Sequence, residues 1–274
     1  MTRIIRTLPL IAAAAIATPA LAQDREDHFN GFYVGASVGQ ANASNNKDAN
    51  PVQFDTNRDG EFNDTVTTTT GANVFARGYC PGVATGNAPG NCAGDDDDLE
   101  YAGRIGYDMR MGNFVVGGLL EASKPQLRDA ATAYSTAPAG YHLSRELDYA
   151  VSARARVGFT PGGGALFYAT GGPSYAKIKH DFTTTNTANT FTPSSDGEMT
   201  WGWQAGGGAE IMVAGNLSLG LEYLYNRYDD DKYYVATGAG TAPTNPLAAN
   251  GGAYLRQDPK FQFHTVRATL GLQF

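Results

Sequence analysis

The sequence predicts an all-β protein: an eight-stranded antiparallel up-and-down transmembrane β-barrel with long extracellular loops and short periplasmic turns. Three observations predict this fold. The chain ends in an unbroken alternating strand, seven further segments alternate in the same way, and the connections between them are short and long in turn. Because strand side chains alternate, one face of each strand can meet lipid and the other the barrel interior.

The C-terminal strand alternates without a break. From Val266 to Phe274 every second residue is apolar, and the residues between them are polar or small. A surface strand of a soluble sandwich would alternate too, but the rest of the chain favours the barrel. The eight predicted strands cover residues 31–40, 99–110, 114–124, 146–160, 165–181, 199–213, 217–228 and 260–274. Gly171-Gly172-Pro173 interrupts the fifth and predicts a bulge or bend there.

The connections between these strands alternate in length. Tight turns are predicted around Gly112, Gly163 and Gly215. Long loops cover residues 41–98, 125–145, 183–198 and 230–259. This order is typical of outer-membrane barrels, whose long loops face outside. Aromatic residues then form two belts: Tyr107, Phe114, Phe159, Tyr168 and Phe274 at the periplasmic rim, and Tyr101, Tyr149, Trp201, Trp203, Tyr223 and Tyr225 at the outer rim.

The first 22 residues read as a secretory signal peptide. Arg3 and Arg6 precede an apolar stretch, and Ala20-Leu21-Ala22 is a small-x-small cleavage site. Loss of this segment would take the formal net charge from −7 to −9. We expect residues 23–274 to form a single barrel domain. No later apolar run approaches the roughly 18 residues that a membrane helix needs.

Mid-strand charges fall on the face that does not meet lipid. They form a predicted lumen charge network of Glu100, Arg104, Asp108, Glu121, Arg154, Arg156, Glu210, Glu222 and Arg267. An eight-stranded barrel is just wide enough for side chains to fill it, so opposite charges should pair and plug the lumen. An ion path through the lumen is the alternative.

The sequence offers no convincing catalytic site. The four histidines are scattered, with His264 expected at the headgroup level of the lipid face. Ser144, His142 and Glu146 can be written as a trio for a lipid-modifying enzyme, but such neighbours occur by chance in many loops. We therefore expect neither catalytic residues nor a cofactor-binding site, and a non-enzymatic protein.

The first long loop carries both cysteines. Cys80 and Cys92 enclose a Pro/Gly-rich segment, and an oxidising compartment favours a disulfide between them. The rest of the loop is rich in Gly, Asn and Thr. This composition predicts that most of the loop buries little apolar surface and stays mobile.

The same loop contains a calcium-like motif. Its candidate ligands are Asp55, Asn57, Asp59, Glu61 and Asp64, with Gly60 at the sixth position. The twelfth position is Val66, where an EF-hand has a bidentate glutamate, and an ordinary polar turn is the alternative. Two acidic runs, 95–98 and 229–231, are either solvated charges or places where divalent cations bridge to lipopolysaccharide phosphates.

Several segments resemble a known family. They are FNGFYVGASVGQ, GRIGYDMRMGNFVVGG, LFYATGGPSYAKIK and RATLGLQF, and they are similar to the small outer-membrane β-barrel surface antigens of alphaproteobacteria, related in fold to the OmpA membrane domain. The resemblance implies a structural and surface-interaction protein that supports envelope integrity. Some members are reported to bind haem or are called porins, so a small-solute channel is the alternative and a lipid-modifying enzyme the third.

The resemblance also implies partners and a location. We expect the bacterial outer membrane, with loops extracellular and termini periplasmic. The partners are outer-membrane lipid, lipopolysaccharide and the barrel-assembly machinery, which would read Phe274 as its signal. Nucleic acid is not expected, and the sequence leaves the ligand of the loops open.

Overall fold

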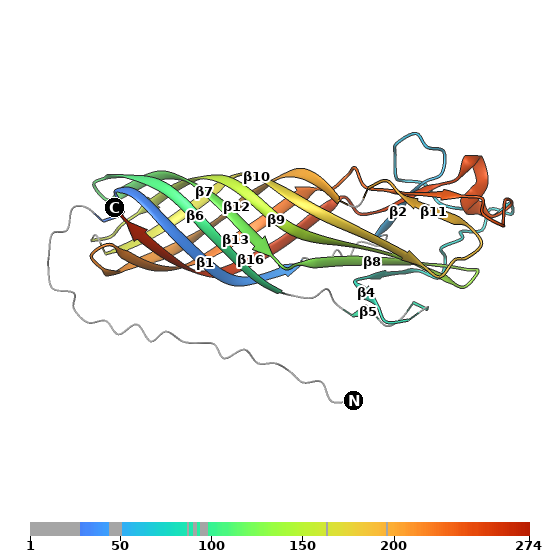
Figure 1. The fold of residues 1–274 in the computed structure, drawn as a ribbon, viewed down its shortest axis with the longest axis horizontal. Coiled ribbons are helices and arrows are strands. Elements are labelled where there is room, and N and C mark those ends of the chain that lie inside the picture. Colours follow the sequence, from blue (N-terminus) through green and yellow to red (C-terminus); the bar gives the residue numbers. More distant parts are fainter. Residues whose placement is uncertain are drawn as a thin grey trace, which may run out of the picture.

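Eight long strands close into an antiparallel barrel (Figure 1). The computed structural model describes residues 28–43, 51–86, 88–89, 92–93, 98–162, 164–195 and 197–274, so the predicted signal peptide lies outside the described residues. The barrel strands are β1 (Gly31–Ala43), β6 (Asp98–Met111), β7 (Phe114–Pro125), β9 (Ala139–Phe159), β10 (Ala165–Thr184), β12 (Gly197–Ala214), β13 (Leu217–Asp229) and β16 (Lys260–Gln273). Pairing of β1 with β16 closes the sheet, which confirms the predicted fold.

The outer face of the barrel is apolar, as the alternation predicts. Phe32 is 68% exposed, Leu221 65% and Trp201 67%, whereas their sequence neighbours on the other face are buried or small. One aromatic residue was wrongly placed: Tyr168 points into the barrel, and its neighbour Phe167 lies on the outer face. Tyr168 alternates with Leu166 and Thr170 on the buried face of β10, so its ring lies inside the barrel.

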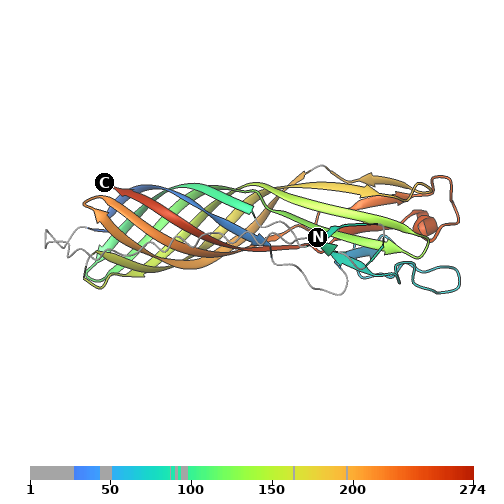
Figure 2. The same cartoon turned by 90° about the horizontal axis from the view of Figure 1, so that it is seen from below.

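The long connections gather at one end of the barrel and form a head (Figures 1 and 2), at the opposite end from the C-terminus. They contain β2 (Val52–Asp55), β3 (Tyr79–Pro81), β4 (Val83–Ala84), β5 (Cys92–Ala93), β8 (Arg128–Ser135), β11 (Thr190–Pro193), β14 (Val235–Gly238), β15 (Tyr254–Gln257) and the 3-10 helix η1 (Pro246–Gly251). Strand β9 begins seven residues earlier than predicted, because residues 139–145 pair with β8. No helix in the described part of the chain is long and apolar enough to cross a membrane.

Two sheets of the head pack around a core of their own. One consists of β8 and the outer parts of β9 and β10, with β3 at its edge, and the other has the order β11-β14-β15-β2. Phe54 and Phe75 stack at 4.3 Å, and Phe75 meets Tyr141 edge to face at 5.2 Å. Val66, Val74 and Phe75 of the first long loop are buried in this core. The expectation that most of this loop buries little apolar surface is therefore wrong for residues 51–86, because five of its apolar side chains, Val52, Phe54, Val66, Val74 and Phe75, are buried in this core.

The irregularity in β10 lies elsewhere than predicted. Gly171, Gly172 and Pro173 keep their register with β12. The shift occurs between Lys177 and Ile178, which face Tyr149 and Leu147 on β9, so that Asp148 is the extra residue of a bulge. A bulge turns side chains to a new face. Glu146 and Tyr149 therefore both lie on the outer face of the sheet, on either side of the bulge.

Candidate functional site

The barrel interior holds the densest set of charged side chains among the described residues. Glu222 on β13 is at its centre. Its carboxylate lies 2.6 Å from Arg267 Nη2, 3.3 Å from Arg154 Nη1 and 3.4 Å from Arg104 Nη1. These arginines come from β16, β9 and β6, so one carboxylate links strands from opposite sides of the barrel.

Glu121 on β7 forms a second centre with the same three arginines. Its Oε2 lies 2.7 Å from Arg267 Nη2, 2.8 Å from Arg154 Nη2 and 3.5 Å from Arg104 Nε. Strand register explains the arrangement, because Arg104 faces Glu121 and Glu222 faces Arg267 across neighbouring strands. Glu100 joins through Arg267 Nη1 at 3.4 Å.

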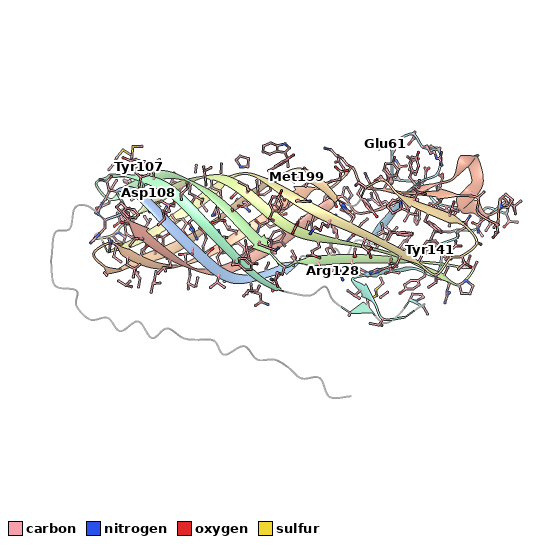
Figure 3. All side chains as sticks on the ribbon, viewed as in Figure 1. Glu61, Tyr107, Asp108, Arg128, Tyr141 and Met199 are labelled. Carbon is pink, nitrogen blue, oxygen red and sulfur yellow. A yellow bond between two sulfur atoms is a disulfide. The ribbon has the colours of Figure 1, made fainter. Side chains whose placement is uncertain are left out.

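A third group lies nearer the C-terminal end of the barrel. Arg156 contacts Asp108 and, at 2.8 Å, Glu210. The rings of Tyr33 and Tyr168 each lie 4.9 Å from its guanidinium carbon, and the Tyr168 hydroxyl donates to Glu222 at 2.8 Å. Figure 3 shows Asp108 at this end of the barrel.

Small residues make room for this group. A Cβ on Gly106 would lie 2.4 Å from the Tyr33 ring, and one on Gly117 would collide with the Asp108 carboxylate. The sequence-predicted charges at 100, 104, 108, 121, 154, 156, 210, 222 and 267 are thus all brought together, and all nine are buried. We call these nine residues the lumen network.

An apolar layer covers the lumen network on the side of the head. It is built inside the barrel by inward residues of the strand ends, chiefly Tyr228, Phe261 and Phe263 with Leu127, Leu147 and Ile178. No inward apolar layer is among the features predicted from the sequence. Its signal was present in the alternation of Phe261 and Phe263 with polar residues at the start of the last strand.

A second charged group, the rim cluster, lies between this layer and the core of the head. Arg145 Nη2 donates to Asp129 Oδ2 at 2.6 Å, and its Nη1 donates to Asp230 Oδ2 at 3.2 Å. The same guanidinium also donates to the backbone carbonyls of Asp258 and Lys260. His180 Nε2 lies 2.9 Å from Asp230 Oδ2, and its ring stacks on Tyr233 at 4.0 Å.

The rim cluster holds its charges through mutual contact. Burial alone would raise the pKa of Asp230, but the hydrogen bond with His180 and the charge of Arg145 outweigh it and hold that pKa below its usual value. Sequence reasoning missed Arg145 because it lay in a segment assigned to a loop. Its partners are 16 and 85 residues away in the sequence, so no local pattern connects them.

The predicted calcium ligands are not gathered around one point. Asp55 accepts the backbone N–H groups of Arg58 at 2.6 Å and Gly60 at 3.0 Å. Asp64 Oδ2 accepts from both the N–H and the hydroxyl of Thr56 at 2.7 Å. Asn57 and Asp59 bond to each other, and Glu61 donates its N–H to Asp59. No three His, Cys, Asp or Glu side chains of the described segments are grouped as a metal site. The calcium site stays a prediction.

Cys80 and Cys92 form a disulfide, as predicted. Of the two acidic runs, Asp230 belongs to the rim cluster, whereas residues 95–97 lie outside the described residues. His264 lies on the outer face, where its Nδ1 is 2.6 Å from the Tyr223 hydroxyl.

The candidate trio of Ser144, His142 and Glu146 is not assembled as a catalytic group. The three residues alternate along β9, so neighbours are separated by about 6.6 Å of strand rise. His142 Nδ1 instead lies 2.9 Å from the Thr132 hydroxyl, and burial lowers the pKa of His142.

Comparison with known proteins agrees with the fold. A model of the outer membrane protein beta-barrel domain family matches residues 8–274, and the chain belongs to this family. The 31 kDa outer-membrane immunogenic proteins of Brucella melitensis and Brucella suis are each 26% identical over 178 residues, which cover 62% of this chain and 64% of the relative. The chain thus matches slightly less than two thirds of their length.

A solved structure supports the architecture. OprG, an outer membrane protein of Pseudomonas aeruginosa, has a TM-score of 0.51 with 12% identity and covers 92% of this chain and 100% of its own. The predicted family resemblance is confirmed, and the protein is an outer-membrane β-barrel.

Loss of Arg154 should weaken the barrel. In Arg154→Ala, Glu121 and Glu222 each lose a buried partner, and an orphaned buried charge costs about 3–5 kcal/mol. Urea unfolding in lipid vesicles measures the change. Lys232→Ala, an exposed position in the head, is the control and should change the free energy of unfolding by less than about 0.5 kcal/mol. Unfolding identical to wild type, without new conductance, would contradict a packed network.

The Asp55 turn should hold its loop without metal. We expect Asp55→Ala to make residues 51–64 sensitive to protease with or without calcium, because the N–H groups of Arg58 and Gly60 lose their acceptor. Proteolysis of the wild type and of Asp59→Ala across a calcium titration, with magnesium as control, separates the two interpretations. Protection by calcium alone that is lost in Asp59→Ala would support the cation site.

Proposed function

We propose that this protein is a structural and surface-interaction barrel of the outer membrane. Its interior is closed, and its head faces the outside of the cell, with both termini in the periplasm. The barrel would support the envelope mechanically, and the head would be the part that other molecules meet. Outer-membrane lipid and lipopolysaccharide surround such a barrel, and the assembly machinery inserts it.

The packing of side chains in successive layers along the barrel interior is the observation that carries this proposal. Along the barrel axis the lumen network, the apolar layer and the rim cluster follow one another, and the core of the head lies beyond them. Arg104, Arg154, Arg156 and Arg267 each meet at least two carboxylates in this interior. An aqueous path would have to cross both paired charges and packed aromatic rings.

The head supports the second half of the proposal. Its strands share a buried core, so it presents a defined surface instead of independent loops. Arg58 fastens the first long loop to this surface, with Nε 2.7 Å from the Gly252 carbonyl and the guanidinium 4.7 Å from the Tyr254 ring. The Brucella relatives carry the name of immunogenic outer-membrane proteins, which agrees with exposure of this part of the molecule.

The wild-type protein should not conduct ions. In planar bilayers we expect no steps above baseline for wild type, because the interior offers no continuous wet path. The double variant Phe261→Ala/Phe263→Ala removes two rings from the apolar layer, and Arg154→Ala opens the lumen network below it. Combining the three changes should produce conductance if the layers form the barrier. Steady single-channel steps in wild type would favour the small-solute channel instead.

The terminal aromatic should be needed for assembly. Phe274 follows the last strand, is 74% exposed and donates its N–H to the Phe32 carbonyl. We expect Phe274→Ala to lower the amount of protein in the outer membrane while secretion into the periplasm continues. Fractionation and heat-modifiable migration measure both amounts, and Phe159→Ala, an aromatic at the same end of the barrel, is the matched control. Equal outer-membrane levels in wild type and Phe274→Ala would remove the signal role.

A further inference from the structure

Lysines and tyrosines alternate around one side of the barrel where it meets the head. Tyr101 on β6 faces Lys124 on β7, and Tyr149 on β9 faces Lys177 on β10. β7 and β9 are neighbours, and their pairing ends at Ser123 and Ala150. Lys124 is the next residue of β7 after this pair, and Tyr149 is the residue of β9 next to Ala150 on the same side. The four residues therefore follow one another around the barrel on adjacent strands. Lys179 lies one strand repeat farther toward the head.

This row marks the edge of the lipid-facing surface. One repeat toward the C-terminal end, the outer face carries Val151 and Trp201, which are 49% and 67% exposed. Toward the head, the outer positions of the same strands are charged, as at Lys179 and Glu146. Aromatic side chains gather where hydrocarbon gives way to headgroups, so the lysines lie at headgroup depth. Figure 3 places Met199, the partner of Lys177 on β12, at this junction.

The β-bulge adds one acid to the lysines. Asp148, its extra residue, lies with its carboxylate 3.0 Å from Lys179 Nζ and 3.7 Å from Lys124 Nζ. Lys177 is also close enough for its charge to act on Asp148. Asp148 thereby holds two ammonium groups near each other, and both lysine side chains remain 50% exposed.

Positive charge exceeds negative charge on this surface. Its bases are Lys124, Lys177, Lys179 and Arg128, and its acids include Asp148 and Glu146. Arg128 is the cross-strand partner of Glu146. Glu146 is also the cross-strand partner of Lys179, and Asp181 is the next exposed residue on this face of β10. With these acids and Asp148 counted against the four bases, the surface keeps an excess of one positive charge. On the other side of the barrel Tyr223 bonds His264 and Tyr225 bonds Gln262, and one repeat toward the head Arg227 lies 3.6 Å from the carboxylate of Asp229.

We propose that Lys124, Lys177 and Lys179 bind a phosphate group of the phosphorylated glycolipid of the outer leaflet, lipopolysaccharide. The ammonium groups would donate to phosphate oxygens, with Tyr101 and Tyr149 packed beside the sugar and the first acyl carbons. The inference rests on the proposed orientation of the head outside the cell, but not on the closed interior. Asp148 competes with the phosphate for Lys124 and Lys179 and sets how tightly it is held.

Titration of the purified, detergent-solubilised protein with fluorescent lipopolysaccharide tests the site. We expect the triple variant Lys124→Gln/Lys177→Gln/Lys179→Gln to bind at least about tenfold more weakly, since each lost charge-assisted hydrogen bond is worth roughly 1.5–3 kcal/mol. Lys232→Gln, the same change at an exposed position in the head, should bind as wild type does. Heat-modifiable migration confirms that each variant is folded.

Asp148→Asn should strengthen the binding of lipopolysaccharide, whereas a folding defect would weaken it. Removal of the competing carboxylate should tighten binding by a factor of about three to ten, because two lysines then face the phosphate alone. Binding that is equal to or weaker than wild type would overturn the role assigned to Asp148 and its lysines.

Three further arms identify the ligand. Chemically dephosphorylated lipopolysaccharide should bind wild type and the triple variant equally weakly, and millimolar inorganic phosphate should compete only partly, because it lacks the contacts with the tyrosines. Chelation of divalent cations with EDTA should leave wild-type binding intact. Loss of binding in EDTA would show cation bridging through acidic residues and overturn the direct lysine site.

The outcome is separable from that of the proposed function. Equal lipopolysaccharide affinity in wild type and the triple variant would overturn this inference and leave a closed barrel standing. A conducting wild-type barrel would overturn the closed interior without changing the titration. If protease cleaves the head of Asp55→Ala only after the outer membrane is permeabilised and not in intact cells, the lysines lie in the inner leaflet and the choice of ligand is overturned.

Discussion

Pairing of charges inside a narrow barrel is the constraint on which the rest of this structure depends. Eight strands leave an interior that side chains fill, so a charged residue on the inner face has little water to face. Each arginine of the lumen network therefore meets carboxylates from strands across the barrel. A buried ion pair adds little net stability compared with a hydrophobic replacement, but loss of one member is expensive. The pairs consequently fix the register of β6, β7, β9, β13 and β16 relative to one another, because a slip of one residue would point Arg104 and Glu121 into lipid.

The head follows from the same strands that build the barrel. β9 and β10 are 21 and 20 residues long and continue without a break from the barrel into the first sheet of the head. They carry Arg145 and His180 to the junction, where both meet Asp230. Because the rim cluster joins β8, β9, β10 and the ends of β13 and β15, the head is anchored on several sides of the barrel mouth. The connections between strands can then share one hydrophobic core even though most of their residues are polar.

The sequence predicts the barrel well because its signals are local. Alternation assigns each strand and its faces, and the nine inner charges follow from the same count; whether those charges act as a plug is for the conductance experiment to decide. The head escapes prediction because its contacts are not local. Phe54 and Phe75 come from the first long loop, and Tyr141 and Leu255 from two others, so these residues meet only after the barrel has brought the strand ends together. Residues 130–139 are Ala, Thr, Ser, Tyr and Pro without a clear apolar–polar alternation, so they do not reveal a hairpin. The bulge at Asp148 was not predicted, because the residues on both sides of it favour a strand and the sequence pattern does not mark the one extra residue.

The outer surfaces of the molecule differ in charge along its axis. The junction with the barrel carries the rim cluster and the lysine row, which is formed by Lys124, Lys177 and Lys179.

At the far end of the head, residues 135–139, 185–188 and 245–247 line one hollow together. These segments contain Thr, Asn, Ser, Ala, Pro and Leu, and no Asp, Glu, Lys or Arg. Some of their polar groups are already paired, as when Asn186 donates to the Tyr141 hydroxyl at 2.9 Å. Contacts made by this end must therefore rely on hydroxyl and amide groups and on small apolar patches. Salt would weaken binding at the lysine row, where unlike charges meet near water, and would leave contacts at the far end almost unchanged.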